Sequence, residues 1–202
     1  MKSSGLLTNL KNDYFLRKLF DNLLKKKSLD IIKYNNYLKD RIKININNYK
    51  EYSEIYSPIE LEIKPINNKY GKFINFKKEN EIYYHIYFNN NKEEIKRNYI
   101  DKDDKVTKIN IRIDYQIISF EGLFEHCKFI ECVCFKKFYR NNINNMGDMF
   151  FGCFSLKELN LSNFNTNNVT NMLGMFNGCS DQFQTKIRAQ YKNIKEEAFN
   201  DY

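Results

Sequence analysis

The 202-residue sequence predicts an α+β protein with N-terminal helices, a small β unit and a short, capped solenoid of repeats. Three observations predict it: helical spacing of apolar residues near the N-terminus, apolar–polar alternation before residue 117, and an ungapped 26-residue repeat after it. The expected parts are a helical unit at 1–57, an antiparallel β unit at 58–104, repeats at 105–180 and a C-terminal capping helix at 181–202.

The N-terminal part is expected to contain two helices, at residues 14–24 and 29–42. In the first, apolar side chains fall on one helix face, and Ser28 is the predicted N-cap of the second. The apolar set is Phe15, Leu16, Leu19, Phe20 and Leu23. This helix pair resembles the F-box fold, which recruits substrates to cullin ubiquitin ligases, although the usual Leu-Pro start and the Trp of that family are absent. The alternative is a simple helical packing unit.

The β unit is predicted from alternation along IELEIKPI at 59–66 and from the strand-rich segments up to residue 88. A further strand is expected in KVTKINIRIDYQI at 105–117, where Ile109, Ile111 and Ile113 share one face. Because Ile109 lies 52 residues before Leu161, this strand is expected to be a degenerate coil that precedes the first full repeat.

The repeat is carried by FEGLFEHC at 120–127, MGDMFFGC at 146–153 and MLGMFNGC at 172–179. Each unit is expected to contain a strand, as in LKELNL at 156–161, then an Asn-rich return segment and a short helix. In the last unit that helix would carry Met172, Met175 and Phe176 and end at Gly178. A strand and a short helix in every 26 residues are typical of a leucine-rich solenoid, whose equivalent side chains stack in columns.

The string GCFSLKELNLSNFNTNNVTNMLGMFNGCS resembles the BspA-type leucine-rich repeat family, also described as a 26-residue surface-protein repeat. The resemblance covers roughly residues 118–180. The first copy departs from the family pattern, with Phe120 in place of Met and Arg140 in place of the return Thr. The resemblance implies a binding scaffold without catalysis, and many bacterial members of the family are exported adhesins.

The candidate binding site is the concave strand face of the predicted solenoid, where polar side chains of adjacent coils would form one stripe. The alternative is that this stripe is only solvated, or covered by the rest of the chain. The partner-binding residues predicted here are Glu131, Cys132, Cys134, Lys136, Lys157, Glu158, Asn160 and Ser162.

No catalytic residue, metal site or cofactor is predicted, and we expect that the protein is not an enzyme. The two histidines, His85 and His126, are interpreted as structural, and no phosphate-binding or metalloprotease motif is present. His126 lies near three cysteines, a grouping that superficially suggests zinc. However, Cys127 belongs to the buried repeat positions, whereas Cys132 and Cys134 would point to the opposite face of a strand, so the ligands would not converge.

The net charge is +8, and residues 1–57 contribute +6, from 12 basic and 6 acidic side chains. We interpret these as solvated helix ends and expect no nucleic acid partner. The sequence has no apolar run that predicts membrane insertion and no signal peptide, so a cytoplasmic location is expected. The predicted function is an intracellular protein–protein interaction scaffold, with a ubiquitin-ligase adaptor or a surface adhesin as alternatives. The sequence specifies neither the partner nor the oligomeric state.

Overall fold

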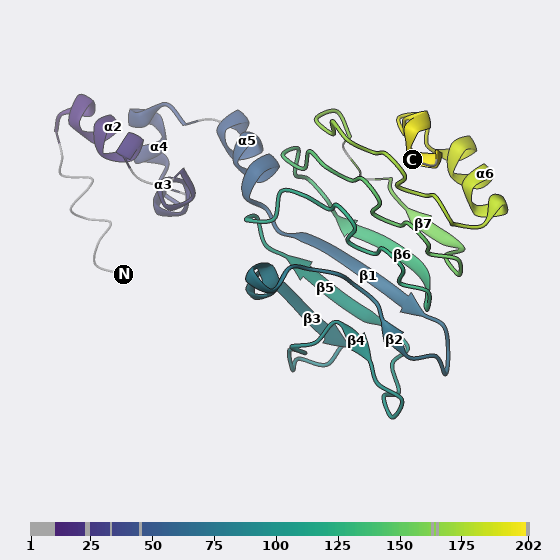
Figure 1. Cartoon of the computed structure of the whole chain (residues 1–202). Helices are drawn as coiled ribbons and strands as arrows, with labels where there is room; N and C mark the ends of the chain where they lie inside the picture. The colour runs from purple at the N-terminus through teal and green to yellow at the C-terminus, as the bar shows by residue number, and fades with distance from the viewer. Residues whose placement is uncertain are drawn as a thin grey trace. The chain divides into compact units, whose positions relative to one another are not determined.

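The computed structural model describes residues 11–22, 25–32, 34–44, 46–162, 164 and 166–200 (Figure 1). The chain divides into two compact units, Met1–Tyr56 and Ser57–Tyr202. The segments predicted at 58–104, 105–180 and 181–202 all lie in the second unit.

The first unit is helical. Its described helices are α2 (Asp13–Asn22), α3 (Lys25–Ile32), α4 (Asn36–Ile42) and α5 (Ile46–Tyr56). A small core joins Leu16 and Phe20 of α2 to Ile32 and Leu38, because the first two lie one helical turn apart and share a face.

The prediction of one helix over 29–42 is wrong. Helix α3 ends at Ile32, and α4 starts at a separate cap, where the Asn35 side chain accepts a hydrogen bond of 3.0 Å from the N–H of Leu38. Ser28 lies inside α3 and not at its cap. The predicted apolar face of the first helix is only partly buried, since Phe15 and Leu19 are exposed, and Leu23 lies outside the described residues.

The second unit is built on a five-stranded sheet with the order β3-β5-β1-β6-β7 (Figure 1). Its strands are β1 (Ile59–Pro65), β3 (Tyr84–Phe88), β5 (Ile109–Ile113), β6 (Ile130–Lys137) and β7 (Glu158–Asn160). A separate pair contains β2 (Gly71–Lys72) and β4 (Tyr99–Ile100), and a 3₁₀ helix, η1 (Lys78–Tyr83), precedes β3. The sheet is mixed, because β6 and β7 are parallel and the other neighbours are antiparallel.

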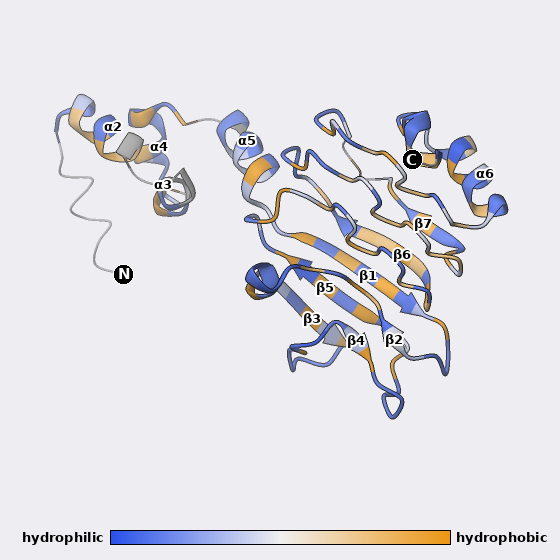
Figure 2. Cartoon of the chain, in the orientation of Figure 1, coloured by the Kyte–Doolittle hydropathy of each residue, from blue (hydrophilic) through white to orange (hydrophobic). Residues whose placement is uncertain are grey.

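The placement of β1 corrects the prediction for residues 105–117. β1 lies between β5 and β6 and pairs with both in antiparallel register. β5 is therefore not a coil stacked below the first repeat. Alternation along β1 and β5, visible as alternating colours in Figure 2, buries Leu61, Ile63, Ile109 and Ile111 and leaves the intervening polar residues on the other face.

The three repeated segments 120–127, 146–153 and 172–179 stack on one another, and we name them the turn stack. The N–H of Phe124 donates to the carbonyl of Met149 at 2.8 Å, and the N–H of Phe150 donates to that of Met175 at 2.9 Å. The ring centroids of Phe124 and Phe150 are 5.1 Å apart, and those of Phe150 and Phe176 are 5.7 Å apart. The predicted column of equivalent aromatic side chains is thus confirmed.

The predicted short helix in each repeat is wrong, because these segments are consecutive turns. Each contains two residues with positive φ, four positions apart: 122 and 126, 148 and 152, 174 and 178. A left-handed residue inside the segment interrupts the right-handed backbone that an α-helix requires. Glycine occupies four of these six positions, and His126 (φ 54°) and Asp148 (φ 53°) occupy the other two.

The predicted leucine-rich solenoid is also wrong, although the α+β class holds. The repeats supply only β6 and β7, the last two strands of a mixed sheet whose other strands come from outside the repeats. The turn stack is closed at one end by Asn75, whose N–H donates to the Leu123 carbonyl at 2.7 Å. It is closed at the other end by η2 (Glu196–Phe199), where the N–H of Phe176 donates to the Ala198 carbonyl at 2.7 Å.

The C-terminal helix α6 (Asp181–Gln190) begins at Ser180, whose hydroxyl accepts a hydrogen bond of 3.3 Å from the Phe183 N–H. Phe183 and Ile187 are buried against the rest of the unit. The helix ends at Gln190, and a turn separates it from η2, so two shorter elements stand where one capping helix at 181–202 was predicted.

Candidate binding surface

The candidate site is the side of the five-stranded sheet that faces away from the hydrophobic core, which we name the polar face. It arises because buried residues alternate with half-buried or exposed ones along β1, β3, β5 and β7, and along β6 apart from two irregular positions. The polar face consists of His85, Tyr87, Asn110, Arg112, Glu60, Glu62, Lys64, Cys132, Cys134, Glu158 and Asn160.

One row of side chains crosses all five strands of this face. The register places Tyr87 beside Asn110, Asn110 beside Glu62, Glu62 beside Cys134, and Cys134 beside Asn160. Neighbouring side chains in such a row are close enough to contact one surface of a partner. The polar face is therefore one continuous surface to which all five strands of the sheet contribute.

The structure brings together most of the residues predicted for partner binding. Cys132 lies opposite Glu158 in the parallel pair of β6 and β7. The Lys157 ammonium lies 2.9 Å from the Glu131 carboxylate, so these two flanking residues also meet. Ser162 lies beyond the end of β7, in a turn where its N–H donates to the Asn160 side chain at 2.9 Å.

Lys136 reaches the polar face from a register irregularity in β6. The pairing with β1 shifts between Glu60 and Leu61, and the Lys136 ammonium lies 3.6 Å from the Glu62 carboxylate. Sequence reasoning missed the part of the face that belongs to β1, β3 and β5, including Glu62 itself. The alternation of apolar and polar residues did predict those segments as strands, but no local sequence pattern indicates that β1 pairs with β6.

Charges on the polar face are largely compensated by near neighbours. Glu62 lies 3.6 Å from both Lys108 and Lys136, and Glu60 lies 2.8 Å from Lys137. The hydrogen bond from Lys157, with a smaller effect of Lys64, lowers the pKa of Glu131. Exposed ion pairs of this kind contribute little to stability. They do produce a surface of alternating charge, not a field of one sign.

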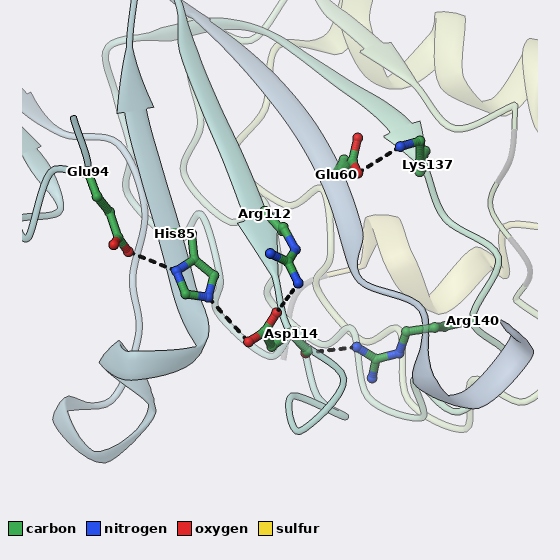
Figure 3. Close-up of polar contacts among 7 residues, drawn as sticks. All are labelled: Glu60, His85, Glu94, Arg112, Asp114, Lys137 and Arg140. Atoms are coloured by element: carbon green, nitrogen blue, oxygen red, sulfur yellow. Dashed lines mark hydrogen bonds and ion pairs between the residues drawn. The ribbon is translucent and has the colours of Figure 1, made fainter. Parts of the chain in front are cut away.

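At the β3 side of the polar face, the side chains form a network of hydrogen bonds and ion pairs (Figure 3). His85 Nδ1 lies 2.8 Å from Glu94, and His85 Nε2 lies 3.2 Å from Asp114. Arg112 also approaches the Asp114 carboxylate, at 3.2 Å. Both ring nitrogens of His85 are thus engaged with carboxylates. The hydrogen bond from Lys96 and, to a smaller extent, that with His85 lower the pKa of Glu94.

Arg140 is fully buried behind this network. Its guanidinium donates to the backbone carbonyl of Asp114 at 3.0 Å, to that of Ile117, and to the Asn142 side chain at 3.0 Å. Burial lowers the pKa of Arg140 to about 10, which still leaves it charged at neutral pH. Arg140 therefore satisfies backbone carbonyls before the first repeat, at the position that Thr166 occupies one repeat later.

The five cysteines are free thiols in two environments. Cys127, Cys153 and Cys179 are buried in the turn stack, where burial raises the pKa of Cys127 and of Cys179 to about 12 and that of Cys153 further. On the polar face, burial and the Glu158 carboxylate raise the pKa of Cys132. Among the residues that the structure describes, no group of three or more histidine, cysteine or acidic side chains is placed to hold a metal ion.

Both edges of the sheet are occupied. At β7, the Tyr191 hydroxyl donates to the Leu159 carbonyl at 3.1 Å and accepts from the Leu161 N–H at 3.0 Å. At β3, the Ile95 N–H donates to the Ile86 carbonyl at 2.8 Å. These contacts use backbone groups that an added strand would need, so the face and not an edge is the accessible part of the sheet.

The comparisons with known proteins bear on the repeats and their flanks. Residues 105–199 match the family model described as "Mycoplasma protein of unknown function, DUF285". The DUF285 match runs from β5 through the turn stack to η2 and does not include the helical unit. It replaces the BspA-type leucine-rich resemblance, which is wrong, and it gives no support to the F-box resemblance of residues 14–42. No curated protein and no solved structure matches the chain.

Within the described part of the chain, none of the helices combines the length and the apolar character that crossing a membrane requires.

Proposed function

We propose that the protein is a binding module without catalytic activity, and that its polar face is the surface that contacts a protein partner. The observation that carries the proposal is the row from Tyr87 to Asn160, which crosses all five strands with polar side chains. Such a row, backed by a rigid apolar core, offers hydrogen-bond donors and acceptors at fixed spacing.

The electrostatics of the face favour a protein over a polyanion. Its lysines already have carboxylate neighbours, as at Glu62 and Glu131, so nucleic acid would have to compete with these pairs. A partner of mixed charge could instead exchange them for pairs across the interface. The free thiols suit a reducing compartment, which supports a cytoplasmic location as part of the proposal. The ubiquitin-ligase adaptor and the surface adhesin stay predictions without a specific observation in their favour.

Site-specific photo-crosslinking in the native cells tests the proposal. A photoreactive amino acid is placed at Asn160 or Arg112 on the polar face, and at Glu93, an exposed residue outside it, as the matched control. We expect the same discrete adduct from both face positions and none from the control position. Absence of adducts at the face, or equal adducts at Glu93, would overturn the assignment of this surface.

A reversal of charge on the polar face supplies a second readout. The Glu158 side chain is exposed and is not part of the hydrophobic core, so Glu158→Arg should leave the fold intact. The reversed charge should weaken the adduct at Asn160. Glu93→Arg, with the same change of charge, should leave that adduct unchanged.

A further inference from the structure

The helical unit carries an exposed apolar surface. Three side chains of α2 and one of α4 are exposed despite their size: Tyr14 by 63%, Phe15 by 64%, Leu19 by 41% and Tyr37 by 57%. We name these four residues the aromatic patch. Large apolar side chains gathered at a surface mark contact sites more often than single exposed ones do.

The patch residues of α2 lie close together, and Arg41 links α2 to the helix that holds Tyr37. The rings of Tyr14 and Phe15 are 5.8 Å apart, and Leu19 follows Phe15 by one helical turn. Arg41 connects the two helices, because its guanidinium lies 5.2 Å from the Tyr37 ring centroid while its Nε donates to the Asp13 carboxylate at 2.7 Å.

Cations border the same patch. The Lys18 ammonium lies 5.9 Å from the Tyr14 ring centroid, and Lys11 and Arg17 are exposed next to it in the sequence. Arg41, in contrast, is largely buried and paired with Asp13, so it positions Tyr37 and is not one of the cations available to a ligand. By sequence, residues 1–57 contain 12 basic and 6 acidic side chains, which account for +6 of the total charge of +8. Two copies of this unit would therefore repel each other, and an anionic surface would be attracted.

We propose that the helical unit binds the surface of an anionic membrane, with the aromatic patch in the headgroup region and the surrounding cations on the lipid phosphates. This inference goes beyond the protein-binding role of the polar face and does not depend on it. Phe15 and Leu19 would insert shallowly, while Tyr14 and Tyr37 place a ring in apolar and a hydroxyl in polar surroundings. Each lysine or arginine near the surface adds to the attraction.

Lipid fits the patch better than nucleic acid does. Bases stack on aromatic rings, but an aliphatic side chain such as Leu19 gains little from them. At Tyr14 and Tyr37, moreover, a cation already lies over the ring. An anionic bilayer offers both an apolar layer for the aliphatic side chain and phosphates for the cations.

Co-sedimentation of the full chain with vesicles tests the proposal. We expect binding to vesicles of phosphatidylglycerol and phosphatidylcholine, no binding to phosphatidylcholine alone, and at least a tenfold weaker partition when salt rises from about 0.1 M to about 0.5 M. Equal binding to both vesicle types, or binding to neither, would overturn the proposal.

Variants locate the contact. Phe15→Ser combined with Leu19→Ser should reduce partition to anionic vesicles by about tenfold or more, because the inserted apolar area is lost. Ile82→Ser is the matched control, since Ile82 is 67% exposed in the other unit and should not change the partition. Circular dichroism checks that both variants keep their helices. Equal losses in the two variants would contradict the role of the patch.

Two further probes separate the other anionic partners. Fluorescence anisotropy with a labelled single-stranded oligonucleotide and with polyglutamate should show weaker binding than anionic vesicles at matched charge concentration. Tighter binding to either probe, abolished by the Phe15 and Leu19 substitutions, would reassign the patch to nucleic acid or to an acidic protein and overturn the membrane proposal.

Discussion

The hydroxyl of Tyr191 replaces a neighbouring strand at the edge that contains Leu159. It donates to the Leu159 carbonyl and accepts from the next inward-facing residue, Leu161, as a backbone amide pair would. The repeat pattern would place another strand here, but α6 lies in this part of the sequence instead. A single side chain thus protects the edge from pairing with another molecule.

Tyr191→Phe should therefore lower the free energy of unfolding by about 1–3 kcal/mol, because it leaves two backbone groups unpaired at a half-buried edge. Urea denaturation followed by fluorescence measures the change. Tyr139→Phe removes a hydroxyl from a side chain that is 57% exposed and should be neutral. Light scattering should also show more self-association for Tyr191→Phe. A neutral result would mean that water satisfies the edge equally well.

Gly152→Ala should destabilise the turn stack by about 2–3 kcal/mol. Gly152 has φ +67°, where a side chain is strained, and an added Cβ would overlap the His126 ring of the preceding turn. The double variant His126→Gly with Gly152→Ala removes the overlap and should recover all but about 1 kcal/mol, the cost of the left-handed backbone. Thermal unfolding of the single and double variants measures the coupling. Additive effects would show that the two positions do not touch.

Asp104 should contribute to acid sensitivity. Two hydrogen bonds from Arg97, at 2.7 and 2.8 Å, are the main cause of the lowered pKa of Asp104. A carboxylate with a lowered folded pKa stabilises the protein above its unfolded value of about 3.9, and that contribution is lost as the pH falls through the folded value. NMR titration of the Asp104 carboxyl should show a midpoint below about 3.9 that moves up in Arg97→Gln. An unchanged midpoint would exclude Arg97 as the cause.

Thiol modification should distinguish the polar face from the turn stack. In the native protein, iodoacetamide should modify Cys132 and Cys134 slowly and leave Cys127, Cys153 and Cys179 unmodified, because the last three are buried with raised pKa. Peptide mapping by mass spectrometry reads out each site. All five should react after denaturation. Modification of Cys153 at the rate of Cys134 would contradict the stacked arrangement.

The sequence predicted the stacking of the repeats because equal spacing imposes equal environments, as the rings of Phe124, Phe150 and Phe176 show. The sequence also predicted that Cys132 and Glu158, which are neighbours on the polar face, would lie on the same surface. It did not reveal that β1 lies between β5 and β6, because pairing between distant segments depends on the whole sheet and leaves no local pattern.

The turns were misread as helices for a different reason. Met172, Met175 and Phe176 have the spacing of a helix face, and Gly178 fits the end of a helix. Consecutive turns bring the same positions to one side. The distinguishing signal was Gly174, four residues before Gly178, because a helix interior rarely holds a residue suited to positive φ.

The closure of the turn stack by Asn75 at one end and by Ala198 of η2 at the other constrains how relatives could vary in length. A further copy of the 26-residue unit could not simply be appended to either end, because both sets of backbone groups are already engaged. Longer relatives would have to gain copies by duplication between the first and last units, and would keep the segments that close the stack at its two ends.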